Sequence, residues 1–133
     1  MKAYVYAGLV AAGLTTGGYA MAHHSFAAEF DYDAMGSIEG EVIEALFVNP
    51  HVRYFVSVVD SDGKETIWDT QTSSVSALTR YGWTVDTIRV GDRIRLSGNL
   101  GRDNAHKLWI REVTTADGRQ IRPVAGGIEE NEQ

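Results

Sequence analysis

The four histidines of this chain are the residues whose type and spacing best suit metal chemistry; they are His23, His24, His51 and His106. The first two follow Ala20-Met21-Ala22, which has the small-x-small form that signal peptidases cleave. Cleavage after Ala22 would leave a free α-amine and two imidazoles at one chain end. An α-amine has a pKa of about 7.7–8, so part of it is neutral and able to bind a metal near neutral pH.

These groups predict a copper site. The amine nitrogen and the Nδ1 atom of His23 can close a six-membered chelate, and an opposing imidazole would complete a T-shaped set of three nitrogens. Nitrogen donors in a tetragonal geometry favour Cu(II), which also has the highest affinity in the divalent series. We expect His51 to close the site because it follows the rigid Asn49-Pro50 turn. His106, at the start of a predicted strand, is the second choice.

Three alternatives remain open at this point. His24 could bind through its own imidazole and amide nitrogen together with the terminal amine. Cleavage after Ala20 would place His23 third in the mature chain, which suits a square-planar Cu(II) or Ni(II) site. In the third alternative the histidines bind no metal, and the Asn-Pro-His sequence serves only the turn.

The first residues indicate export. Lys2 precedes the apolar run Ala3–Leu14, which is shorter than the roughly 20 residues needed to span a bilayer. A positive start, a short apolar run and a small-residue cleavage site are typical of a signal peptide. We therefore predict a signal peptide at residues 1–22, a periplasmic or secreted protein, and no stable membrane anchor after cleavage.

The composition narrows the classes of partner. The chain has 133 residues, which suits one domain, and a net charge of −6. An acidic chain gains no general attraction to phosphate backbones, so nucleic acid is not an expected partner. The absence of cysteine excludes disulfides and thiolate metal sites. A metal ion, a small ligand or a protein partner remains.

A small β-barrel is predicted to carry these residues. After an N-terminal arm at 23–36, alternating apolar residues predict strands at 37–48, 51–60 and 65–70, one starting at Arg93, and one at 106–118. A short helix is predicted after Ser73-Ser74, ending at Gly82. The order β-β-β-α-β-β predicts an all-β fold with one short helix: a five-stranded OB-fold-like barrel over 37–124. Another small antiparallel sandwich or open barrel is the alternative, and residues 125–133 are predicted to be a disordered acidic tail.

The barrel offers a second kind of site. Tyr54 and Trp68 are predicted on the face of the second and third strands, where aromatic rings can stack on bases or sugars, although both could instead fill the core. Arg93 and Arg95 share one side of the fourth strand and could hold an anion or form a solvated face. This reading gives the alternative function, a non-catalytic ligand- or protein-binding envelope module without metal.

No set of residues indicates catalysis. The chain has no Gly-x-Ser-x-Gly nucleophile motif and no glycine-rich phosphate loop. Copper at the chain terminus could activate oxygen, but a single small barrel leaves little surface for a polymeric substrate. The sequence therefore favours a binding protein over an enzyme.

Four segments carry a resemblance to a known family; they are Ala22–Asp31, Gly40–Val52, Tyr81–Trp83 and Val90–Gly98. The chain resembles a family of small exported proteobacterial proteins of unknown function, in which His-His-Ser at the mature start is combined with Asn-Pro-His. The resemblance implies export and an OB-fold-like barrel, and it implies no particular activity.

Overall fold

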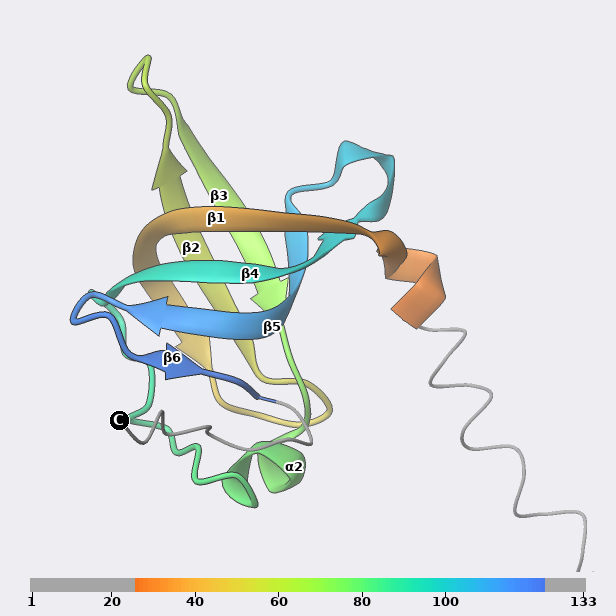
Figure 1. The fold of residues 1–133 in the computed structure, drawn as a ribbon, viewed down its shortest axis with the longest axis vertical. Coiled ribbons are helices and arrows are strands. Elements are labelled where there is room, and N and C mark those ends of the chain that lie inside the picture. The colour runs from red at the N-terminus through yellow and green to blue at the C-terminus, as the bar shows by residue number, and fades with distance from the viewer. Residues whose placement is uncertain (1–25, 124–133) are drawn as a thin grey trace, which may run out of the picture.

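The computed structural model describes residues 26–123, which form one strand-rich barrel (Figure 1). A helical turn at residues 26–29 leads into the first strand. The elements are β1 (Phe30–Leu46), β2 (Arg53–Val59), β3 (Glu65–Gln71), α2 (Val75–Thr79), β4 (Arg93–Gly101), the 3-10 turn η1 (Arg102–Asn104), β5 (Lys107–Thr115) and β6 (Gln120–Ile121). The predicted signal peptide, His23, His24 and the predicted acidic tail lie outside the described residues.

The strands form a closed barrel. Their order is β3-β2-β1-β4-β5-β6, with antiparallel neighbours, and a parallel pairing of β3 with β5 closes the ring. The long strand β1 serves both halves, because Glu41 pairs with Ser57 of β2 and with Arg93 of β4. Five strands in this order, with a helix between the third and the fourth, make an OB-fold barrel, which confirms the predicted fold class. The short strand β6 extends the sheet beyond β5.

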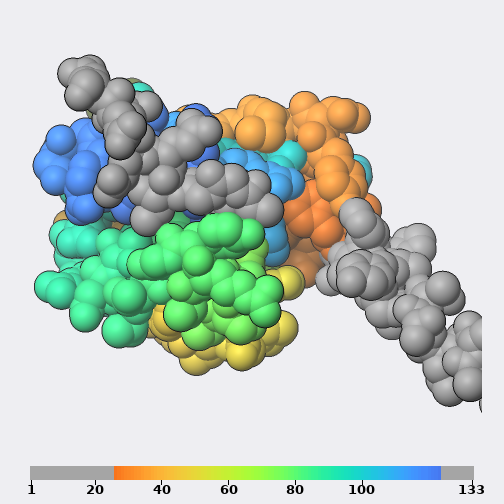
Figure 2. Space-filling model, turned by 60° about the horizontal axis from the view of Figure 1, so that its bottom comes forward, coloured from red at the N-terminus to blue at the C-terminus, as the bar shows by residue number. Residues whose placement is uncertain are grey.

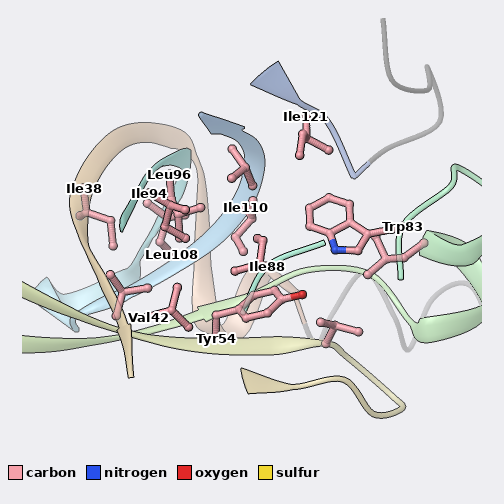
Figure 3. Close-up of a cluster of buried hydrophobic side chains, with 14 residues drawn as sticks. Ile38, Val42, Tyr54, Trp83, Ile88, Ile94, Leu96, Leu108, Ile110 and Ile121 are labelled. Carbon is pink, nitrogen blue, oxygen red and sulfur yellow. The ribbon is translucent and has the colours of Figure 1, made fainter. Parts of the chain in front are cut away.

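The core follows the alternation that the sequence predicts. Ile38 and Val42 of β1 point inward, and so do Leu108 and Ile110 of β5 (Figure 3). The step from Ile110 to Val113 contains the predicted bulge, because Ser97 pairs with Glu112 while the next residue of β4 pairs with Ile110. The inward face is therefore kept on both sides of the bulge.

Two glycines allow the strands to pack closely. A Cβ atom at Gly40 would lie 2.1 Å from the Ser57 carbonyl oxygen, and one at Gly98 would lie 1.8 Å from the Trp109 carbonyl oxygen. Both contacts are with backbone, which cannot rotate away as a side chain can. The closely curved barrel therefore requires glycine at these two positions.

The helix α2 and the chain after it cover one end of the barrel. Ser74 caps the helix by accepting a hydrogen bond from the Ala77 amide at 3.2 Å. Gly82 has a positive φ of 81°, which turns the chain so that Trp83 enters the core with 2% exposure. This end of the molecule faces the viewer in Figure 2, where α2 and the following residues form a continuous layer over the strands. The predicted helix is confirmed, although α2 ends at Thr79.

The first strand begins earlier than the sequence predicts. β1 starts at Phe30, inside the predicted arm at 23–36, rather than at Ser37. Phe30 is buried with 2% exposure, and the Asn99 side chain donates hydrogen bonds to the carbonyl oxygens of Asp31 and Tyr32. Within residues 26–123, no helix is long and apolar enough to cross a membrane.

Candidate functional site

Trp109 is the centre of an aromatic cluster on the outside of the barrel. Leu108 and Ile110 point into the core, so the side chain between them points outward. The His51 ring meets the Trp109 ring edge-on, with centroids 5.1 Å apart. The rings of Phe26 and Phe30 lie 5.3 and 5.7 Å from the same ring. We call these four residues, together with Tyr32, whose ring lies 4.6 Å from that of Phe26, the Trp109 cluster.

His51 is held in this cluster by hydrogen bonds of residues that precede and follow it in the chain. On the preceding side, the Asn49 side chain accepts a hydrogen bond from the Val75 amide at 3.0 Å. On the following side, Val52 exchanges backbone hydrogen bonds with Ser73 and Thr72, at 3.1 and 2.9 Å. The loop before β2 is thus fixed to the end of β3 and the start of α2. It presents His51 toward Trp109 of β5.

The helical turn at residues 26–29 is held on the barrel by charged side chains. Lys107 Nζ lies 2.8 Å from a Glu29 carboxylate oxygen, and Arg102 Nε donates to the Ala27 carbonyl oxygen at 2.6 Å. The Arg111 guanidinium lies over the Phe26 ring, 5.7 Å from its centroid. These contacts therefore hold residues 26–29 on the barrel and Phe26 within the Trp109 cluster.

One buried side chain connects these contacts. Asn99 is 3% exposed, and its Oδ1 atom accepts a hydrogen bond from Arg111 Nε at 2.8 Å while its Nδ2 atom donates to the carbonyl oxygens of Asp31 and Tyr32. Asn99 also pairs with Trp109 across β4 and β5. The position of residues 31 and 32 is thus coupled to the strand that carries Trp109.

The second described histidine lies elsewhere. His106 is exposed, and its ring contacts Trp68 with centroids 5.3 Å apart. His51 and His106 therefore pack against different tryptophans. Among residues 26–123, no three histidine, aspartate or glutamate side chains are grouped so that they could hold a metal ion. A metal site at His51 would need donors from outside the described residues.

Of the two aromatic residues predicted for a ligand-binding face, one is buried in the core and the other is partly buried. Tyr54 was predicted there, but it lies in the core with 1% exposure, because it shares the inward side of β2 with Val52 and Val56. Burial raises the pKa of its phenol to about 12, an effect that the nearby Trp83 indole partly offsets. Trp68 is partly buried and packs against the core cluster. Neither ring is arranged as an open stacking platform.

Arg93 and Arg95 are exposed on β4, side by side as predicted, and both face Glu39 of β1. Arg95 Nη2 lies 2.9 Å from a Glu39 carboxylate oxygen, and Arg93 Nε lies 3.7 Å from the other. The Arg95 hydrogen bond and charge, with a smaller contribution from Arg93, lower the pKa of Glu39. Both guanidinium groups are therefore paired with a carboxylate of the chain itself.

Sequence reasoning missed several residues of the Trp109 cluster. Phe26 and Phe30 fell in a segment without clear periodicity, and their contacts join positions far apart in the chain. For Trp109 a signal was present, because it stands between two inward-facing residues of a predicted strand. An outward-facing Trp109, taken together with the aromatic residues Phe26 and Phe30, could have indicated an aromatic cluster on this surface.

Comparison with models of protein families assigns the chain to a family. Residues 12–109 match the family of unknown function DUF6152. The chain belongs to this family. The matched range includes all four histidines and most of the barrel, and it confirms the resemblance to a family without an assigned activity. No curated protein sequence matches significantly.

Two solved structures resemble this DUF6152 member. One is the mitochondrial single-stranded DNA binding protein Rim1 of S. cerevisiae, with a TM-score of 0.48, 12% identity, and coverage of 62% of this chain and 93% of that one. The other is the N-terminal domain of PriB protein from Thermoanaerobacter tencongensis, with a TM-score of 0.43, 16% identity, and coverage of 62% and 94%. At these scores the fold assignment rests on the strand order and the ring closure described above.

Proposed function

We propose that this protein is exported, loses residues 1–22, and binds Cu(II) through the nitrogen atoms of its new N-terminus and the imidazole of His51. The observation that carries the proposal is the shared contact with Trp109. Phe26, three residues after His23, and His51 both lie against that one indole ring, with centroids 5.3 and 5.1 Å away. The predicted chelating residues are therefore joined to Phe26, which is held beside His51, the predicted third ligand.

The reach of the chain is sufficient. An extended chain covers at most about 3.3–3.6 Å per residue, so the three residues from His23 to Phe26 span up to about 10 Å. The Phe26 and His51 rings cannot be farther apart than the sum of their separations from the Trp109 ring, which is a similar distance. A short return of the chain toward the barrel would bring the amine and the His23 imidazole to His51.

The donor set supports copper over other metals. An amine and imidazoles are nitrogen ligands of the kind that Cu(II) prefers, and the chain offers no thiolate. His51 is favoured over His106 as the closing ligand because the Trp68 contact of His106 is separate from the Trp109 cluster. We propose binding of the metal for trafficking or sequestration, in the periplasm or outside the cell.

The proposal is tested by Cu(II) titration of protein whose intact mass shows a start at His23. His51→Ala should weaken binding by at least tenfold, whereas His106→Ala, the matched control, should leave it unchanged. A form with one additional residue before His23 should also bind more weakly, because its first amine is displaced from the chelate. Equal binding by His51→Ala and the unchanged protein would refute His51 as a ligand. Absence of binding by the correctly processed protein would instead favour the envelope module without metal.

A further inference from the structure

Three polar atoms in the core have no hydrogen-bond partner among the described residues. They are the Tyr54 hydroxyl, the Thr72 hydroxyl and Trp83 Nε1. Their residues are 1%, 0% and 2% exposed. Leaving a buried donor or acceptor unpaired is unfavourable, so three such atoms in one core call for a shared explanation.

Tyr54 and Trp83 lie close together in the core (Figure 3), and Thr72 lies between β3 and α2. Thr72 follows β3, and its amide donates to the Val52 carbonyl oxygen at 2.9 Å. Two residues earlier, the Thr70 hydroxyl donates to the Tyr54 carbonyl oxygen at 2.7 Å, so Tyr54 and Thr72 are diagonal neighbours on the inward face of β2 and β3. Figure 3 shows the Tyr54 hydroxyl directed toward the Trp83 indole.

We propose that these three groups hold one buried water molecule. An indole N–H can only donate, whereas each hydroxyl can donate and accept. A hydrogen bond from Trp83 Nε1 to the Tyr54 oxygen would account for the effect of the indole on the Tyr54 pKa, but it would still leave the Tyr54 proton and the Thr72 hydroxyl without partners. A water molecule accepts from the indole and exchanges bonds with both hydroxyls, which gives it the roughly three partners that are usual for buried water.

The proposed water connects three separate parts of the chain. Tyr54 belongs to β2, Thr72 follows β3, and Trp83 belongs to the segment after α2 that closes the barrel end (Figure 2). The water would therefore fasten the cover to the strands, beside the loop that carries His51. This inference does not depend on metal binding.

A matched pair of substitutions tests the proposal by the sign of its effect. Thr72→Val keeps the shape of the side chain and removes the hydroxyl, while Thr72→Ser keeps the hydroxyl and removes a methyl group. If the hydroxyl binds water, Thr72→Val lowers the melting temperature by several degrees, and more than Thr72→Ser does. If the hydroxyl is simply unpaired, Thr72→Val leaves the melting temperature unchanged or raises it, which would overturn the proposal.

A crystal structure at about 1.5 Å resolution gives the direct observation. We expect a water peak within hydrogen-bond distance of all three atoms in the unchanged protein, and loss or displacement of that peak in Thr72→Val. A core with no peak between these atoms, or a peak that does not change in Thr72→Val, contradicts the three-partner site. The crystal structure shows directly whether the water is present, so this test holds even if Thr72→Val changes the melting temperature for another reason.

Discussion

Tyr54 illustrates how a single residue can be correctly placed in a strand and wrongly assigned a role. Its position in the alternation with Val52 and Val56 predicts an inward side chain, and the structure buries it. The expectation of a stacking surface came from the fold class, not from that alternation. When a fold-level expectation and the local period disagree, the local period is the better guide to where a side chain points.

The burial of Tyr54 predicts a loss of stability at high pH. Its folded-state pKa is about 12, above the ordinary value of 10.0, because burial disfavours the phenolate. Above pH 10 the unfolded chain releases this proton while the folded protein keeps it, so stability is complete below pH 10 and falls as the pH rises. The free energy of unfolding should fall by about 2 kcal/mol between pH 10 and pH 12.

Denaturant unfolding at several pH values measures this effect. Tyr54→Phe should show a smaller decrease than the unchanged protein over the same range, because phenylalanine has no proton to release. Equal slopes for the unchanged protein and Tyr54→Phe would contradict the raised pKa.

Gly98 gives the second prediction at the scale of a residue. A Cβ atom there would lie 1.8 Å from the Trp109 carbonyl oxygen, so Gly98→Ala must displace β4 from β5. We expect a loss of about 3 kcal/mol or more in the free energy of unfolding, at the upper end of overpacking effects. Gly36→Ala is the control, because the three atoms nearest to its Cβ all belong to the movable Leu100 side chain, and it should cost clearly less. Similar costs for the two variants would show that β4 and β5 separate easily.

At the scale of the elements, the start of β1 depends on a side chain from another strand. Asn99 donates to the carbonyl oxygens of Asp31 and Tyr32, where the register between β1 and β4 is interrupted. Residues 23–35 show no strong apolar period over their length, so the sequence did not predict a strand there. The inner part of β1 is different, because the burial of Ile38 and Val42 was readable from their spacing.

Removal of the Asn99 side chain should therefore loosen the chain start selectively. In Asn99→Ala we expect faster amide hydrogen exchange at residues 26–34, by at least tenfold, with smaller changes in β2 and β3. Loss of the amide group also leaves Arg111 without the acceptor that holds it near Phe26. Ser37→Ala, at an exposed position of the same strand, should leave the exchange unchanged. Uniform acceleration across the barrel would indicate a general loss of stability.

At the scale of the whole molecule, no local sequence pattern predicts which strands close the ring. The closure could be expected only because the order of the elements indicated a barrel. The parallel pairing of β3 with β5 involves Asp69–Gln71 and Lys107–Trp109, which are far apart in the chain and carry no shared local signal. The order of the elements sufficed to predict the barrel because few arrangements bury these strands without an open edge. The Trp109 cluster depends on the same closure, so its membership could not be predicted from spacing alone.

The proposed copper site depends on that closure, and this predicts a coupling of copper binding to folding. In the unfolded chain the terminal amine and its own imidazole remain neighbours, but His51 is near them only when the loop before β2 and the helical turn at 26–29 both pack on Trp109. A ligand that binds only the folded state, present at 100 times its dissociation constant, adds about 2.7 kcal/mol to the free energy of unfolding. Any binding to the unfolded chain makes this gain smaller.

Cu(II) should therefore raise the melting temperature of the processed protein. His51→Ala should lose this increase while keeping the weak binding of the terminus, and His106→Ala should retain it. An equal increase in His51→Ala would mean that copper binds without the barrel, and the site would then belong to the terminus alone.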